Sequence, residues 1–211
     1  MRETLFLLKR LYAKKTFTVA LTLVVFFVFT ASSANAQCTR PIVTCNVGPC
    51  LGTVGWLVDD AFSDYCSNGW STAGGAVRVS GGSEICGWTG NDYVKFFKPP
   101  SSNSGKLVQT FTHDGGYTNP NFYLGFLIEG SISQDFGSSL DVSIYNFTDN
   151  TWTFVDRFDY NNTFNWCQLK SYSFYKPEWR GKQLRVVFIS TIYSSTTNWR
   201  VDSVALDQSI Q

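Results

Sequence analysis

Apolar and polar residues alternate one by one along most of the chain after residue 53. In the segment 139–147, for example, Leu140, Val142 and Ile144 alternate with polar side chains. A period of two is typical of β-strands that bury one face. The spacing of an amphipathic helix is nearly absent from the same region. The pattern therefore predicts an all-β domain.

Ten segments carry this alternation, and loops rich in Gly, Pro, Asn and Asp separate them. The predicted strands are 54–58, 76–79, 92–97, 106–112, 122–128, 139–147, 151–158, 169–175, 182–190 and 199–206. Many short strands with polar connections are typical of antiparallel sandwiches and barrels. Because most strands have one apolar and one polar face, we expect two sheets packed over one core. Residues 54–211 are thus predicted to form one β-sandwich.

The first 36 residues differ in composition from the rest of the chain. Basic residues precede the apolar run 17–30, and the segment ends in Ala34-Asn35-Ala36. This order is typical of a secretory signal peptide, so we expect cleavage after Ala36 and a secreted, extracellular or cell-surface protein. An uncleaved membrane anchor is the alternative.

Removal of residues 1–36 changes the charge of the protein. That segment holds five of the 17 Lys and Arg but only one of the 16 Asp and Glu, which leaves 12 basic and 15 acidic residues. Nucleic acids and anionic membrane surfaces are held mainly by clusters of Lys and Arg. No such cluster is present after residue 36, so we expect neither partner, nor a membrane span in the mature chain.

All six cysteines follow the signal peptide. They are Cys38, Cys45, Cys50, Cys66, Cys86 and Cys167. An even number in an exported protein predicts three disulfides, whereas a zinc site is disfavoured because the chain has no C-x-x-C pair and a single histidine. Fifteen pairings are open. We favour Cys66–Cys86, and we expect the segment 37–53 to be a stapled arm with one cysteine bonded to Cys167.

Three strand motifs give the chain a family likeness. They are "L-x-Q-x-F" at 107–111, the hairpin "L-x-V-x-I-Y…W-x-x-V" at 140–155, and the terminal "W-x-V-D-x-V-x-L" at 199–206. With these motifs the chain resembles the galactose-binding-like jelly rolls, which include many carbohydrate-binding modules and MAM-type extracellular domains. The likeness covers most of the chain after Cys50. It implies a two-sheet jelly roll and a binding module for carbohydrate or for cell adhesion.

The resemblance also implies a structural calcium ion between the first and last strands. By position, Asp202 matches the aspartate of the last strand, and Asp60 is the candidate for the early acid, with Asp59 and Asp64 as alternatives. Carboxylates mixed with main-chain carbonyls suit calcium better than magnesium or zinc. The alternative is that Asp202 faces solvent or pairs with Arg200 or a loop amide. No organic cofactor is expected, since no nucleotide or flavin motif is present.

Aromatic residues are abundant, with seven Trp, ten Tyr and 18 Phe in the full chain. Those in alternating strands are expected to pack in the core. This group contains Phe122, Phe126, Phe154, Phe188 and Trp199.

Other aromatic residues occur in polar, glycine-rich loops, where a ring can stack on a sugar and neighbouring polar groups can bind hydroxyls. The candidate ligand-binding residues are Trp88, Asn91, Tyr117, Asn119, Trp179 and Arg180. Loops at one end of a sandwich lie close together, which predicts a composite site for a glycan or surface polymer. For each aromatic residue taken singly, local packing is the alternative.

Catalysis has less support in the sequence. His113 is the single histidine and is expected on a surface loop, and no G-x-S-x-G motif is present. Two carboxylate pairs are candidates for glycoside hydrolysis, Asp156 with Asp159 and Glu129 with Asp135, but the sequence does not give the separation that this chemistry needs. We therefore favour a non-catalytic binding module. The alternatives are a self-associating structural subunit of a fibre, matrix or surface layer and, third, a glycan-active hydrolase or lyase.

Overall fold

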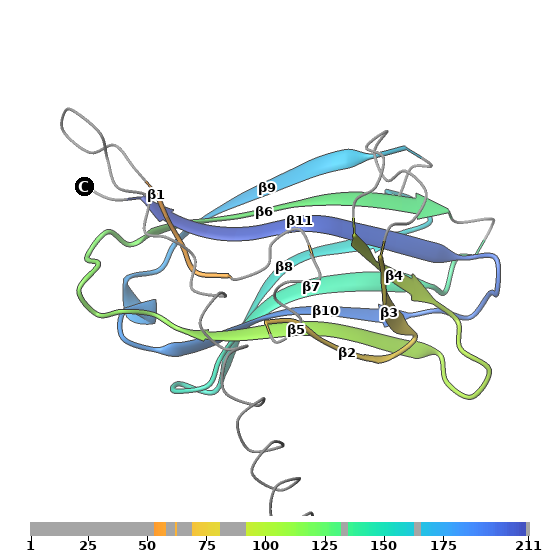
Figure 1. The fold of residues 1–211 in the computed structure, drawn as a ribbon, viewed down its shortest axis with the longest axis horizontal. Coiled ribbons are helices and arrows are strands. Elements are labelled where there is room, and N and C mark those ends of the chain that lie inside the picture. The colour runs from red at the N-terminus through yellow and green to blue at the C-terminus, as the bar shows by residue number, and fades with distance from the viewer. Residues whose placement is uncertain are drawn as a thin grey trace, which may run out of the picture. The chain divides into compact units, whose positions relative to one another are not determined.

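The computed structural model confirms the all-β prediction (Figure 1). It describes residues 53–57, 62, 69–80, 92–131, 135–162 and 166–209. Each predicted strand overlaps an observed one. The strands are β1 (Thr53–Gly55), β2 (Ser71–Gly74), β3 (Ala76–Val79), β4 (Tyr93–Phe97), β5 (Ser104–Thr112), β6 (Asn121–Ser131), β7 (Ser139–Asn146), β8 (Thr151–Asp159), β9 (Gln168–Tyr175), β10 (Gln183–Thr191) and β11 (Asn198–Ser209). A short 3-10 helix, η2 (Pro177–Trp179), lies between β9 and β10.

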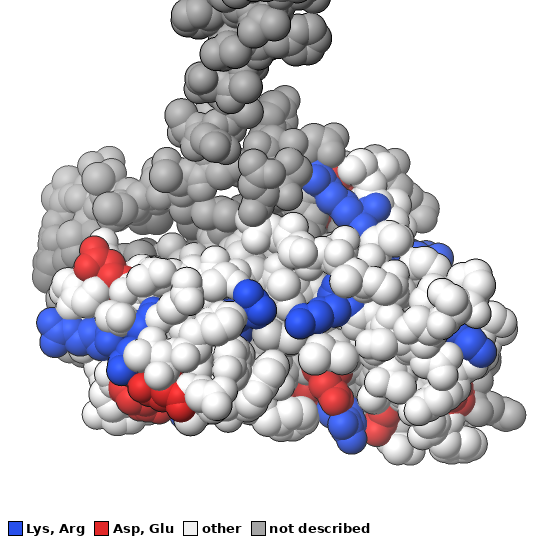
Figure 2. Space-filling view, turned by 90° about the horizontal axis from the view of Figure 1, so that it is seen from below, with Lys and Arg blue, Asp and Glu red and all other residues white. Residues whose placement is uncertain are grey.

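The strands form two antiparallel sheets. One has the order β3-β4-β11-β6-β9, with β1 also paired to β11, and the other has the order β2-β5-β10-β7-β8. Figure 1 shows them as two layers, with the five-stranded sheet below. Figure 2 views the molecule from that side and shows mostly uncharged surface, with Lys, Arg, Asp and Glu at separate places.

The chain crosses between the two sheets at Gly75. This residue joins β2 of one sheet to β3 of the other, and a Cβ atom at Gly75 would lie 2.1 Å from the carbonyl oxygen of Phe97. The preceding Gly74 has a φ of +61°, a conformation that side chains disfavour. Strand β2 itself was not predicted, because all four of its residues are exposed and no alternation marks them.

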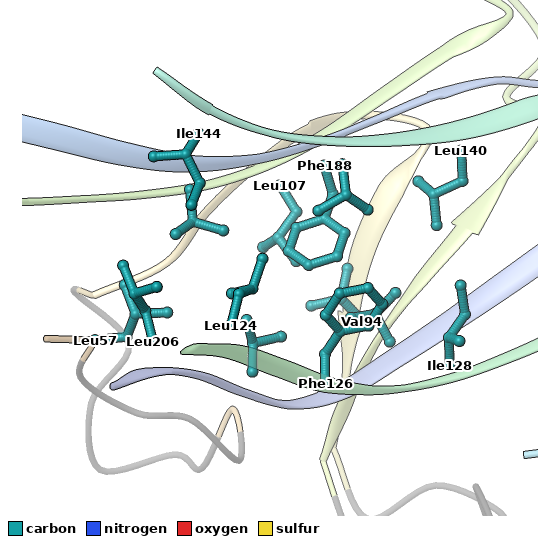
Figure 3. Packing of buried hydrophobic residues seen from close by; sticks show 14 of the residues in the cluster. Leu57, Val94, Leu107, Leu124, Phe126, Ile128, Leu140, Ile144, Phe188 and Leu206 are labelled. Carbon is teal, nitrogen blue, oxygen red and sulfur yellow. The ribbon is translucent and has the colours of Figure 1, made fainter. Parts of the chain in front are cut away.

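The core lies between the two sheets and is made by the apolar side of each strand. In Figure 3, Leu107, Leu140, Ile144 and Phe188 of one sheet point towards apolar residues of the other. The rings of Phe126 and Phe188 meet edge to face, with centroids 5.2 Å apart. The predicted core positions Phe122, Phe126, Phe188 and Trp199 are confirmed as buried.

The prediction that Phe154 belongs to the core is wrong, because its side chain is 60% exposed. Along the β7–β8 ladder, Val142 pairs with Asp156 while the next residue, Ser143, pairs with Phe154. Val155 is thus an extra residue, a β-bulge that reverses the alternation of β8. As a result Phe158 points into the core and Phe154 points to the outer face of the sheet.

Candidate functional site

The loops that carry the predicted site contain a buried histidine. His113 was expected on the surface, but it is 1% exposed, and its ring stacks on Trp56 with centroids 4.4 Å apart. The N–H of Gly181 donates to its Nδ1 atom at 3.3 Å, so Nε2 carries the proton and donates to Oε1 of Gln208 at 3.0 Å. Burial lowers the pKa of His113 below its ordinary value, with Gln208 and Asp114 opposing this shift and Arg180 adding to it. A neutral imidazole is thus part of the packing.

Two predicted ligand-binding residues of these loops are also buried, which corrects their expected exposure. Trp179 is 2% exposed and packs edge to face on Phe122, with ring centroids 5.0 Å apart. Asn119 is buried, and its Oδ1 atom accepts hydrogen bonds from the backbone and side-chain N–H groups of Asn121. Neither side chain offers a free face to a sugar.

The other predicted residues are placed as follows. Tyr117 is half-buried, and its ring meets that of Trp56 edge to face at 5.5 Å. Arg180 is exposed, and its Nε–H donates to the carbonyl oxygen of Gly115 at 2.6 Å, which ties two loops of this end together. Trp88 and Asn91 lie outside the described residues. A ligand-binding role for these four residues stays a prediction.

A different set of aromatic side chains lies on the outer face of the five-stranded sheet. Tyr145 of β7 is directly opposite Arg185 of β10 on one side and Trp152 of β8 on the other. Arg185 is in turn opposite Thr110 of β5. These four residues form one row across four strands, on the side away from the core, and the row spans roughly 14 Å at the usual strand spacing of about 4.8 Å.

Ring contacts extend this row along the sheet. The ring of Tyr145 lies 4.7 Å from that of Trp152 and 4.8 Å from that of Phe147. Phe154, two residues beyond Trp152 on β8, is on the same face because side chains two apart in a strand point to the same side. We refer to Tyr145, Phe147, Trp152 and Phe154 as the aromatic strip. Trp152 is 58% exposed, so the strip offers apolar ring surface to solvent.

Polar groups border the aromatic strip. The phenol of Tyr145 donates to Oδ1 of Asn150, and the guanidinium of Arg185 lies 4.5 Å from the ring centroid of Phe147. The same guanidinium donates from Nε to Oγ1 of Thr110 at 2.7 Å. Apolar rings flanked by hydroxyl, amide and guanidinium groups can hold a flat ligand that is apolar on its face and polar at its edge.

The aromatic strip was not predicted from the sequence. Phe154 was expected in the core, which is the phase that Phe158, four residues further along β8, occupies. A single extra residue within the strand reverses that phase, and nothing in the local sequence marks its position. The strip was therefore missed, while aromatic residues of the loops were favoured.

Neither predicted carboxylate pair is assembled. Asp156 accepts a hydrogen bond from the phenol of Tyr172, whereas Asp159 accepts one from the backbone of Asn161 and is opposite Ser139. The pairing of Asp156 with the core-facing Val142 places it on the other side of β8 from Asp159. Burial, together with the bond to Asp156, raises the pKa of Tyr172, so its phenol remains a donor.

The two carboxylates of the second pair, Glu129 and Asp135, are bound by different partners. Glu129 lies 3.8 Å from the guanidinium of Arg200. Asp135 accepts hydrogen bonds from Ser138, Ser194 and Thr197 and joins the loops after β6 and β10. Burial alone would raise the pKa of Asp135, but these bonds outweigh it and lower the pKa. Both carboxylates thus have structural partners.

The predicted metal ligand Asp202 lies at an irregular point of β11. The pairing with β6 shifts between Asp202 and Ala205, and Ser203 has a φ of +52°. Asp202 is 1% exposed, which excludes the solvent-facing alternative, and its Oδ1 atom accepts the N–H of Ser203 at 2.6 Å. Among the described residues, no group of three or more His, Cys, Asp or Glu could hold a metal ion. Asp59, Asp60 and Asp64 lie outside them.

Two further predictions concern the chain as an exported protein. Cys167 is disulfide-bonded, but Cys38, Cys45, Cys50, Cys66 and Cys86 lie outside the described residues, so the pairing stays a prediction. The signal peptide lies outside them too. In the part of the chain that is described, no helix has the length and apolar character needed to cross a membrane.

Comparisons with known proteins identify the fold. No protein-family model matches the sequence, and no curated protein does. The solved structure of TmCBM61 in complex with β-1,4-galactotriose is similar with a TM-score of 0.51 at 13% identity, over 74% of this chain and 99% of that chain. At this identity the likeness shows the fold alone. The fold that this likeness shows is a two-sheet jelly-roll β-sandwich.

An enzyme has a similar fold as well. The Stig cyclase Fisc from Fischerella sp. TAU, in complex with a pyrrolidinylidene-indole, has a TM-score of 0.50 at 14% identity, over 76% of this chain and 100% of that chain. The jelly roll therefore supports both binding and catalysis in proteins of this shape. The side chains of this chain must decide between them.

Proposed function

We propose that this protein is a secreted, non-catalytic carbohydrate-binding module that holds a glycan on the aromatic strip. The observation that carries the proposal is the row formed by Trp152, Tyr145 and Arg185 on the outer face of the five-stranded sheet. Trp152 keeps more than half of its surface exposed although it lies within a sheet. Large exposed aromatic side chains with adjoining polar groups are typical of recognition surfaces.

The chemistry of the strip fits a sugar chain. The C–H face of a pyranose ring can stack on the indole of Trp152 or the ring of Phe154, while hydroxyl groups at the sugar's edge bind to side chains beside the strip. A face built on strands is rigid, so little conformational entropy is lost when a glycan binds. The sugar-bound neighbour TmCBM61 supports this class of ligand.

Retention on a glycan array tests the proposal. We expect the wild-type protein to bind at least one plant or microbial polysaccharide without cleaving it, and Trp152→Ala to reduce the affinity at least tenfold. Trp166→Ala is the matched control, because Trp166 is also about equally exposed, at 60%, but follows the opposite end of β8. Equal binding by wild type and Trp152→Ala, or hydrolysis of the bound glycan, would contradict the proposal.

Self-association is a second candidate function, supported by β9. This strand is at the edge of its sheet, and on its outer side Leu169 is 74% and Tyr175 is 72% exposed. Exposed apolar edge strands can pair with other chains. If the protein self-associates, size-exclusion chromatography with light scattering should show a dimer or larger assembly. The variant Leu169→Lys should then be a monomer. A monomer at high protein concentration would exclude it.

We also propose a structural calcium ion at Asp202, with Asp60 as the early acid. In support, Asp202 is a buried carboxylate in a stretch of β11 between the parts that pair with β4 and β1, and buried carboxylates are stabilised by cations or several donors. The ion would steady the fold. Chelation is expected to lower the melting temperature of the wild type, and that of Asp202→Asn much less. An unchanged wild-type melting temperature would exclude the ion.

A further inference from the structure

Two contacts fix the guanidinium group of Arg185 on the outer face of the five-stranded sheet. Its Nε–H donates to Oγ1 of Thr110 at 2.7 Å, and its Cζ atom lies 4.5 Å from the ring centroid of Phe147. The residue is half-buried between its cross-strand neighbours Thr110 and Tyr145. A guanidinium held by both a hydrogen bond and a ring has little rotational freedom left.

Arg185 nevertheless forms no ion pair with any described residue. Of its five N–H donors, one is used by Thr110, which leaves the two terminal nitrogens for a ligand. An oriented cation without an anion is thus part of the row that contains Trp152.

Arg157 on the same face shows the opposite arrangement. It binds Asp141 with two hydrogen bonds, of 2.7 and 2.8 Å, and these, together with the nearby Asp159, raise its pKa. The acids at outward positions of β7 and β8 are therefore gathered around Arg157. Asp141 is four residues from Tyr145 along β7, roughly 13 Å at about 3.3 Å per residue. The row around Arg185 has no such neutralising group.

From these observations we infer that Arg185 binds the carboxylate of a uronic acid residue, so that the ligand of the aromatic strip is an acidic glycan. A planar guanidinium fork matches a carboxylate with two parallel hydrogen bonds. A single oriented cation beside the rings is complementary to a single acidic group beside a stacked sugar. The inference rests on the proposed carbohydrate-binding function and names the class of its ligand.

The test compares ligands that differ only in the charge of the carboxyl group. Oligogalacturonate and oligoglucuronate are each titrated against their methyl esters by isothermal calorimetry, with wild type, Arg185→Gln, Arg185→Lys and Trp152→Ala. We expect the wild type to bind at least one acid about tenfold or more tightly than its ester. This corresponds to the 1.4 kcal/mol of a tenfold change, within reach of a charged hydrogen-bond pair.

The variants separate the roles of charge and ring. Arg185→Gln should lower the affinity for the acid at least tenfold and that for the ester much less. Arg185→Lys should restore only part of the loss, because the ammonium group lacks the fork. Trp152→Ala should weaken binding of both ligands. Circular dichroism and melting of each variant check that the fold is retained.

Failure of the inference differs from failure of the proposed function. If acid and ester bind equally and Arg185→Gln changes neither, the glycan-binding proposal stands and the assignment of Arg185 is wrong. Binding of sulfated but not uronic glycans, with sensitivity to Arg185→Gln, would also overturn the carboxylate assignment. If neither these ligands nor any array glycan is bound, the proposed function itself fails.

Discussion

His113 illustrates how burial decides the chemistry of a single residue. Its loop is polar and glycine-rich, which predicts exposure, yet the ring stacks on Trp56 and bonds to Gln208 and Gly181. The loop is polar in sequence because its backbone must turn, whereas the imidazole supplies a flat surface for packing. Long-range contacts of this kind do not appear in the local sequence.

A pH-dependent stability follows from this arrangement. Because the pKa of His113 is lowered from 6.5 in the folded state, the unfolded chain takes up a proton at a higher pH than the folded chain does. The stability that neutral, buried His113 contributes is therefore complete above about pH 6.5. It falls as the pH drops below this value towards the pKa of His113 in the folded state. Asp114 and Arg180 are the charged groups that act on the ring.

Denaturant unfolding between pH 8 and pH 5 measures this effect. Wild type should lose stability over that range, and His113→Gln, although less stable at pH 8, should show a flatter profile. Identical slopes in the two proteins would show that His113 does not contribute to the pH dependence.

Two tryptophans provide a second test at the residue scale. Trp179→Ala removes a buried indole and should cost about 3–5 kcal/mol of unfolding free energy. Trp152→Ala removes an exposed one and should change it by no more than about 0.5 kcal/mol. Chemical denaturation of both variants checks this. A small loss for Trp179→Ala would restore that residue as a candidate for the ligand site.

At the scale of strands, β8 and β9 are edge strands of different sheets that are joined by one hydrogen bond. The phenol of Tyr172 on β9 donates to Asp156 on β8, and its ring stacks on Phe126 in the core. The bulge at Val155 gives Asp156 its inward direction. The same irregularity thus exposes Phe154 and closes one side of the sandwich.

Removal of this bond should have a measurable cost. Tyr172→Phe leaves the half-buried carboxylate of Asp156 without its phenol donor, and we expect a loss of about 1–2 kcal/mol. Asp156→Asn and the double variant complete a thermodynamic cycle, in which the double variant should lose less than the two single losses combined. Strictly additive losses would mean that the two side chains do not stabilise each other.

The strands themselves were predictable, because burial of one face imposes a period of two that any sheet of this kind must show. The pattern failed where that cause is absent. In β2 no residue is buried, and in β8 and β11 an extra residue shifts the phase. Since the aromatic strip depends on such a shift, the candidate site could not be predicted from alternation, although the jelly roll could.

At the scale of the whole molecule, the jelly roll leaves the choice of function to its surface. A similar fold holds galactotriose in one solved structure and belongs to a cyclase in another. In this chain the carboxylate pairs that could serve hydrolysis are divided among other partners, while aromatic rings and an oriented guanidinium share one face. This shared face is the arrangement on which the proposed binding function rests.

The most direct test of this account is an NMR titration with a glycan selected on the array, which follows the indole N–H signals of the tryptophans. We predict that the signal of Trp152 shifts with ligand concentration, whereas those of the buried Trp179 and Trp199 stay in place. Assignment uses the single Trp→Phe variants. A titration in which Trp88 responds and Trp152 does not would place the ligand at the loops and contradict the account.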